Sequence, residues 1–178
     1  MSGLQETRGK HKPFCPLSPC YDSAFLIAWK ITVMESDASL ELPMVMVTAF
    51  TADRKAILNR EDAPALFEEA WELCDDWTAL AYVILPDHIH VLATPSNQEA
   101  PTPKRWAKAW KKEVSKAWPD KSQKPVWKLG STESFLKTPQ DFERKWTVMR
   151  QNPVRRGLTA TPEDWPYQKQ LREAPPSP

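Results

Sequence analysis

Hydrophobic and polar positions alternate along the chain in a way that predicts several short strands. An apolar, β-branched run at Met44 to Phe50 predicts the first strand, since polar residues follow it. Two similar runs, Leu80 to Leu85 and His88 to Thr94, are joined by a Pro-Asp pair, which is the pattern of a tight hairpin. A fourth strand is expected near Val126 to Leu129, or just after it around Phe135.

Between these runs the apolar spacing changes to that of helices. Asp62 is expected to cap a first helix that ends near Trp77, because apolar residues recur at intervals of three to four. They are Leu66, Ala70, Leu73 and Trp77. A second helix is expected from Lys104 to Trp118, with an apolar face and a basic face.

A last helix is predicted from Thr138, whose hydroxyl is a helix cap, with Asp141 completing an imperfect capping box. It must end at Asn152, because the following proline disfavours helical geometry in the residue before it. The resulting order, β-α-β-β-α-β, predicts an α+β fold: a ferredoxin-like antiparallel sheet with an additional C-terminal helix.

The ends of the chain have another character. Residues 1–23 and 169–178 are polar and rich in proline, so we expect a disordered leader and a disordered tail around a single domain at residues 24–168. Within that domain the apolar stretch from Ala24 to Val33 fits a strand or a short helix equally well. No signal peptide or membrane span is expected, and three cysteines with two in the leader suit a reducing, cytoplasmic location.

The net charge of +1 conceals a segregated distribution. Lys104 to Lys128 contains nine basic residues against two acidic ones, interleaved with Trp106, Trp110 and Trp118. Such a stretch offers charge for phosphates and rings for stacking, as in proteins that bind nucleic acids. A solvated amphipathic helix explains the same pattern equally well. The candidate DNA contacts in this stretch are Lys104, Arg105, Lys108 and Lys112.

Two histidines make the strongest candidate for chemistry. His88 and His90 alternate with Ile89, so both imidazoles are expected on one face of their strand, the open face of the sheet. Neutral imidazoles at this spacing suit a divalent metal ion, although a complete site needs a carboxylate, an amide or water as well. The alternative is a pair of exposed or hydrogen-bonded strand histidines.

Three blocks, in order, resemble the REP-associated tyrosine transposases, a branch of the single-tyrosine HUH transposases. Residues 82–92, YVILPDHIHVL, are similar to that family's Tyr-Val-x-Met-Pro-Asp-His-x-His-Leu strand pair. Residues 126–128, VWK, resemble its Leu-Trp-Gln step. The third block resembles the family's C-terminal signature. It consists of Lys145-Trp146, residues 150–158 (RQNPVRRGL) and residues 162–167 (PEDWPY). The resemblance spans residues 43–171.

The resemblance implies a metal-dependent reaction on single-stranded or hairpin DNA. A divalent ion, Mg²⁺ or Mn²⁺, would polarise a phosphodiester while a helix tyrosine attacks phosphorus and forms a 5'-phosphotyrosine link. His88 and His90 would be the metal ligands. The C-terminal signature adds four candidate DNA contacts: Arg150, Asn152, Arg155 and Arg156. The two last arginines are also explained as partners of helix carbonyls. A homodimer stays open, because the family often works on palindromic ends.

Two departures from the family pattern bear on activity. The family's tyrosine stands four residues before the Asn-Pro-Val step, where this chain has Val148. Val148 lies about 125° around the helix from the expected buried stripe, so core packing alone does not account for an apolar residue there. Glu133 and Ser134 replace a common Asp-His pair, and Glu133 remains a candidate third metal ligand.

Three hypotheses follow. The first is a DNA-binding relative of the transposases that has lost nicking and joining. The second is an active nuclease or transposase that uses water or a displaced tyrosine as its nucleophile. The third is a ferredoxin-like module that binds a metal or a partner without nucleic acid, against which the three blocks and the basic segment argue.

Overall fold

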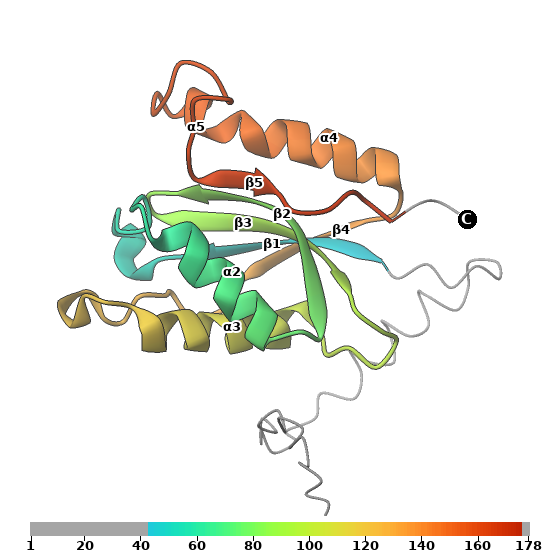
Figure 1. The fold of residues 1–178 in the computed structure, drawn as a ribbon, viewed down its shortest axis with the longest axis horizontal. Coiled ribbons are helices and arrows are strands. Elements are labelled where there is room, and N and C mark those ends of the chain that lie inside the picture. Colours follow the sequence, from blue (N-terminus) through green and yellow to red (C-terminus); the bar gives the residue numbers. More distant parts are fainter. Residues whose placement is uncertain (1–42, 176–178) are drawn as a thin grey trace, which may run out of the picture. The chain divides into compact units, whose positions relative to one another are not determined.

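A computed structural model describes residues 43–175, which form a five-stranded antiparallel sheet with three helices of two turns or more (Figure 1). The expected leader and the stretch from Ala24 to Val33 lie outside the described residues. The sheet order is β4-β1-β3-β2-β5, and every neighbouring pair is antiparallel. The strands are β1 (Met44–Phe50), β2 (Trp77–Leu85), β3 (His88–Pro95), β4 (Thr132–Leu136) and β5 (Gln168–Gln170).

The helices are distributed over both faces of this sheet. α2 (Ala63–Leu73) and α3 (Pro103–Ala117) pack on the face that carries Ile89 and Val91. α4 (Pro139–Arg150) lies across the opposite face, as Figure 1 shows. A short helix, α5 (Asn152–Arg155), follows it directly, and the 3₁₀ turns are η1 (Ala52–Arg54) and η2 (Lys121–Gln123). The first four strands, α2 and α3 confirm the predicted β-α-β-β-α-β order.

The start of α4 follows the sequence closely. The Thr138 hydroxyl accepts from the Asp141 backbone N–H at 3.1 Å, and the Asp141 carboxylate accepts from the Thr138 backbone N–H at 3.1 Å, so the capping box is complete. Phe142, Trp146 and Met149 form the predicted buried stripe and pack against apolar residues of β2 and β3. This stripe holds α4 over the histidine-bearing face of the sheet.

The first helix differs from its prediction. α2 ends at Leu73, and Trp77 begins β2 instead of closing the helix. Its buried face consists of Ala63, Phe67, Ala70 and Trp71, whereas Leu73 is exposed. Trp77 is buried as a strand residue because its ring stacks on Trp106 and its indole N–H donates to the Pro101 carbonyl. Asp62 precedes the helix without a capping bond and pairs instead with Arg60.

The tryptophans of the basic segment are also corrected. Trp106, Trp110 and Trp118 are fully buried, so they belong to the core and offer no ring to a nucleic acid. The exposed residues of α3 are basic apart from Ala117, as the amphipathic alternative predicts.

The expected tail begins too early at residue 169. Gln168–Gln170 pairs with β2, and the backbone N–H groups of Leu171 and Arg172 donate to the Leu80 carbonyl. Within residues 43–175 no helix has the length and apolar character needed to cross a bilayer.

Candidate functional site

His88 and His90 lie side by side on β3, on the sheet face that α4 partly covers. Their rings meet edge to face with 4.8 Å between centroids, and the Phe50 ring lies 5.2 Å from that of His88. Register explains this arrangement, because Phe50 pairs with His88 and Thr48 with His90 across β1 and β3. The face that was predicted to be open is therefore partly covered. Side chains of β1 flank the histidines, and α4 lies over this face of the sheet.

Each imidazole is anchored through the same ring atom. His88 Nδ1 lies 2.8 Å from Asp87 Oδ1, and His90 Nδ1 lies 2.7 Å from the Thr48 hydroxyl. Neither Nε2 atom has a hydrogen-bond partner within residues 43–175. A carboxylate on Nδ1 favours the tautomer with its proton there and the lone pair on Nε2. The Nε2 atom of His88, and in the matching tautomer that of His90, is then available to a ligand.

Asp87 is the centre of a network that links three distant segments. Its carboxylate accepts from Arg156 NH1 at 2.5 Å and pairs with Arg54 Nε at 3.0 Å, while its backbone carbonyl accepts from the Thr51 amide and hydroxyl. Burial alone would raise the pKa of Asp87, but the bonds from Arg156 and His88 outweigh it and lower the pKa to about 2. Asp87 is therefore a buried, ionised support for His88.

Both histidines are held in the neutral form. Burial lowers the pKa of His90 to about 3, and the electrostatic effects of the neighbouring His88 and Lys145 act in the same direction. Burial also lowers the pKa of His88, against the opposing effect of Asp87. Neutral imidazoles are the form that binds metal ions, so the chemistry of these donors suits a metal at neutral pH.

The donor set is incomplete, however. Residues 43–175 contain no group of three or more His, Cys, Asp or Glu side chains placed to hold a metal ion. Glu133 pairs with Val47 in the sheet register and so lies on the α2 and α3 face, close to Lys104. The structure thus does not bring Glu133 to the histidines, which remain a two-ligand site that water or phosphate oxygens would complete.

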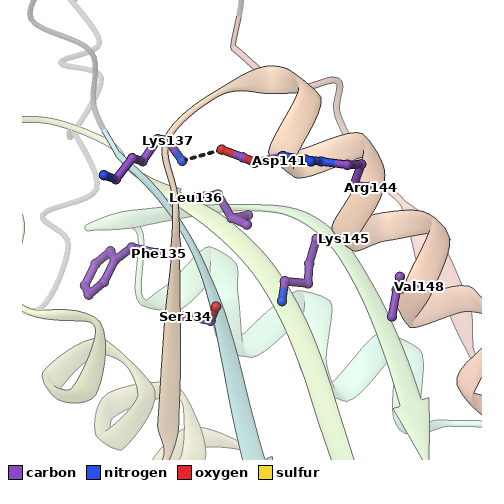
Figure 2. A pocket seen from close by; sticks show the side chains of 8 residues that line it. All are labelled: Ser134, Phe135, Leu136, Lys137, Asp141, Arg144, Lys145 and Val148. Atoms are coloured by element: carbon purple, nitrogen blue, oxygen red, sulfur yellow. Dashed lines mark hydrogen bonds and ion pairs between the residues drawn. The ribbon is translucent and has the colours of Figure 1, made fainter.

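A hollow of about 420 Å³ lies between α4 and β4 (Figure 2). Val148 lines it with 46% of its surface exposed, as its position outside the buried stripe predicted. Figure 2 shows Lys145 extending from α4 over the strands, one turn before Val148. The remaining lining residues are Ser134, Phe135, Leu136, Lys137, Asp141 and Arg144.

The predicted DNA contacts separate into two groups. Lys104, Arg105, Lys108 and Lys112 are exposed on α3, so the sheet lies between them and the histidines. The second group lies at the end of α4 and in α5 or just after it. In this group Arg150 pairs with Glu163 at 2.6 Å, and Arg156 pairs with Asp87. Arg155 is exposed, and Asn152 begins α5.

Neither described tyrosine has a hydrogen bond or a ring contact to His88 or His90 within residues 43–175. Tyr82 faces α2, where its hydroxyl donates to Glu68 at 2.8 Å, and burial together with this bond raises the pKa of Tyr82 above its usual value. Tyr167 packs edge to face on Trp165 beyond β2. Tyr21 lies outside the described residues.

Sequence reasoning missed Asp87, Thr48, Arg54 and Lys145 as parts of the site. Asp87 carried a signal, since it directly precedes His88 in the hairpin turn. Lys145 also carried a signal, because it precedes Val148 by three residues and residues at this spacing lie on the same side of a helix. Arg54 carried none: it reaches Asp87 from a turn in which Asp53 and Arg54 both adopt positive φ.

Comparison with known proteins gives a structural likeness at low sequence identity. Neither a scan of protein-family models nor a search of curated proteins gave a match. Among solved structures, a REP-associated tyrosine transposase bound to a REP hairpin is similar with a TM-score of 0.60 and 18% identity, over 75% of this chain and 79% of that chain. A transposase candidate from Deinococcus radiodurans R1 is similar with a TM-score of 0.46 and 15% identity, over 66% of this chain and 98% of that chain. The chain therefore has an α+β fold similar to that of a REP-associated tyrosine transposase.

Proposed function

We propose that this protein is a DNA-binding relative of the single-tyrosine HUH transposases that recognises single-stranded or hairpin DNA without forming a phosphotyrosine link. The observation that carries the proposal is Val148. It stands exposed on the helix that crosses the histidine-bearing face, where the resemblance requires a tyrosine. Valine has no nucleophilic atom, and Tyr82 is turned to the other face.

The hairpin ligand is inferred from a relative and from charge. The similar solved transposase is bound to a REP hairpin. In this chain, Lys137, Arg144 and Lys145 line the hollow beside α4, and their charge attracts phosphates. DNA is thus expected to lie along α4, over the histidines.

His88 and His90 would hold a divalent metal through their Nε2 atoms, with Asp87 and Thr48 fixing the ring orientations. Two imidazoles completed by oxygen ligands suit Mn²⁺ better than Mg²⁺, which prefers an all-oxygen shell. When bound, such an ion would supply Lewis-acid polarisation of a phosphodiester. The protein's own contribution is to keep both imidazoles neutral and oriented.

The proposal is tested by restoring the missing group. Wild-type protein, Val148→Tyr and Val148→Phe are incubated with Mn²⁺ and a labelled DNA hairpin that carries a random single-stranded 5' extension. Wild type should bind the hairpin and leave no denaturation-resistant protein–DNA adduct. Val148→Tyr should form the adduct, whereas Val148→Phe, which adds the ring without the hydroxyl, should not.

The outcomes separate the alternatives. An adduct with wild type would overturn the proposal, because a nucleophile would then be present. Cleavage without an adduct, abolished in His88→Ala, would instead favour a water nucleophile; the intact, neutral histidine pair makes this the second candidate function. Absence of hairpin binding at low salt would reject both.

A further inference from the structure

Among the cations of α4, Lys145 differs in having no carboxylate partner within the described residues. Arg144 pairs with Asp141, and Arg150 pairs with Glu163. Lys145 is half-buried, yet within residues 43–175 no acidic side chain forms an ion pair with it. Partial burial removes water from an ammonium group, and such a cost is normally offset by a counter-charge. Lys145 is therefore a candidate binding group for an anion.

The charges around Lys145 favour an anion. The hollow holds three cations and one carboxylate, that of Asp141. The Asp141 carboxylate already accepts from the backbone N–H groups of Lys137 and Thr138, each at 3.1 Å, and pairs with Arg144. Its charge is thus committed within α4, and the remaining balance in the hollow is positive.

The hollow lies beside α4, on the sheet face that carries the histidines. α4, which carries Lys145, packs on β3, the strand of His88 and His90. Val148 lines the hollow together with Lys145, and its side chain is short (Figure 2). An anion held by Lys145 would consequently lie on the same sheet face as the free Nε2 atoms.

We propose that Lys145 binds a backbone phosphate of the DNA strand in the hollow between α4 and β4, and thereby positions the strand over His88 and His90. The inference rests on the proposed DNA-binding function and assigns it a specific contact. Lys137 adds a second positive charge to the hollow, because Arg144 is paired with Asp141. The single negative charge of one phosphodiester balances the positive charge of the Lys145 ammonium.

The test uses fluorescence anisotropy with a labelled single-stranded oligonucleotide at several salt concentrations. For single strands each phosphate contact contributes roughly 0.7 to the slope of log K against log salt concentration. Lys145→Gln should lower that slope by about 0.7 and weaken binding about ten-fold at low salt. Lys145→Arg should keep the slope. Lys169→Gln is the matched control, since Lys169 pairs with Glu68 at the β5 edge.

Two results would overturn the inference in distinguishable ways. If wild type binds DNA and Lys145→Gln retains the full salt slope, the phosphate contact is wrong while the proposed function stands. If wild type does not bind, both fail. A general folding defect is recognised by thermal unfolding and by Lys145→Met; Lys145→Met should bind like Lys145→Gln, and a wild-type slope in that variant counts against the contact.

Discussion

Asp87 determines which nitrogen of His88 faces the open side of the sheet. Its carboxylate bonds to Nδ1, and Arg54 and Arg156 keep that carboxylate ionised and fixed. Loss of such an outer partner typically reduces metal affinity ten- to hundred-fold, roughly, in characterised sites. This residue, not a third ligand, is therefore expected to control how well the two-histidine site holds a metal.

Asp87→Asn should weaken Mn²⁺ binding by about ten-fold or more. The amide cannot provide the negative charge that favours the Nδ1-protonated tautomer, and it leaves two arginines without a counter-charge. Mn²⁺ titration followed by electron paramagnetic resonance measures the affinity. Asp164→Asn is the control, because Asp164 is exposed and its partner among the described residues is the nearby Thr161 hydroxyl. Equal affinity of Asp87→Asn and wild type would contradict the supporting role.

The same residues predict how stability depends on pH in metal-free protein. Folding lowers the pKa of His90 from 6.5 to about 3, so the unfolded chain takes up a proton below pH 6.5 while the folded one does not. The groups around it are His88, Asp87 and Lys145. Stability is therefore complete above about pH 6.5 and should fall as the pH is lowered toward 3. Asp87 adds a further loss between its ordinary value of 3.8 and about 2.

Urea unfolding with a chelator present checks this dependence. The midpoint should decrease from pH 7.5 to pH 4.5 in wild type. It should decrease less in His90→Gln, because the glutamine side chain at position 90 does not titrate. A wild-type midpoint that stays constant between these pH values would show that the buried histidine does not stay neutral.

At the scale of elements, local patterns were sufficient for β1, for β3 and for the start of α4. β1 has the predicted bounds, β3 extends one residue further, and α4 begins at the predicted cap. The end of α2 was misplaced because Leu73 and Trp77 continue a helical spacing that tertiary packing overrides: Trp77 is buried by stacking on Trp106, which is distant in sequence. The tryptophans of α3 likewise alternate with lysines in sequence, and only the packed structure shows which side is core.

The candidate site was predictable in part for the same reason. Strand alternation places both histidines on one face, and helix periodicity places Val148 outside the buried stripe. The two ion pairs of Asp87 were not predictable, because Arg54 and Arg156 come from segments far from Asp87 in sequence. The position of Glu133 depended on the register between β1 and β4, and a shift of one residue would have reversed its face.

At the scale of the whole molecule, the sheet separates two basic surfaces. The α3 surface consists of Lys104, Arg105, Lys108 and Lys112, and the α4 surface consists of Lys137, Arg144 and Lys145. They lie on opposite sides of the sheet. Two layer spacings of roughly 10 Å each separate them, which is more than the screening length of about 8 Å in physiological salt. A short strand bound over the histidines is thus expected to sense α4 directly and α3 weakly.

This separation predicts a dependence on DNA length. Replacing all four cations of the α3 surface by glutamine should change the affinity for a single strand of about six nucleotides by less than about two-fold, because so short a ligand does not reach around the sheet edge. A long hairpin that extends past β4 should lose affinity and salt dependence in the same variant if α3 contacts its stem. Anisotropy titrations of both ligands against one protein preparation provide the comparison, with each ligand serving as the other's control. Equal, large losses for the two ligands would show that α3 contributes to the primary site, and would place the strand on the face of the sheet opposite to His88 and His90.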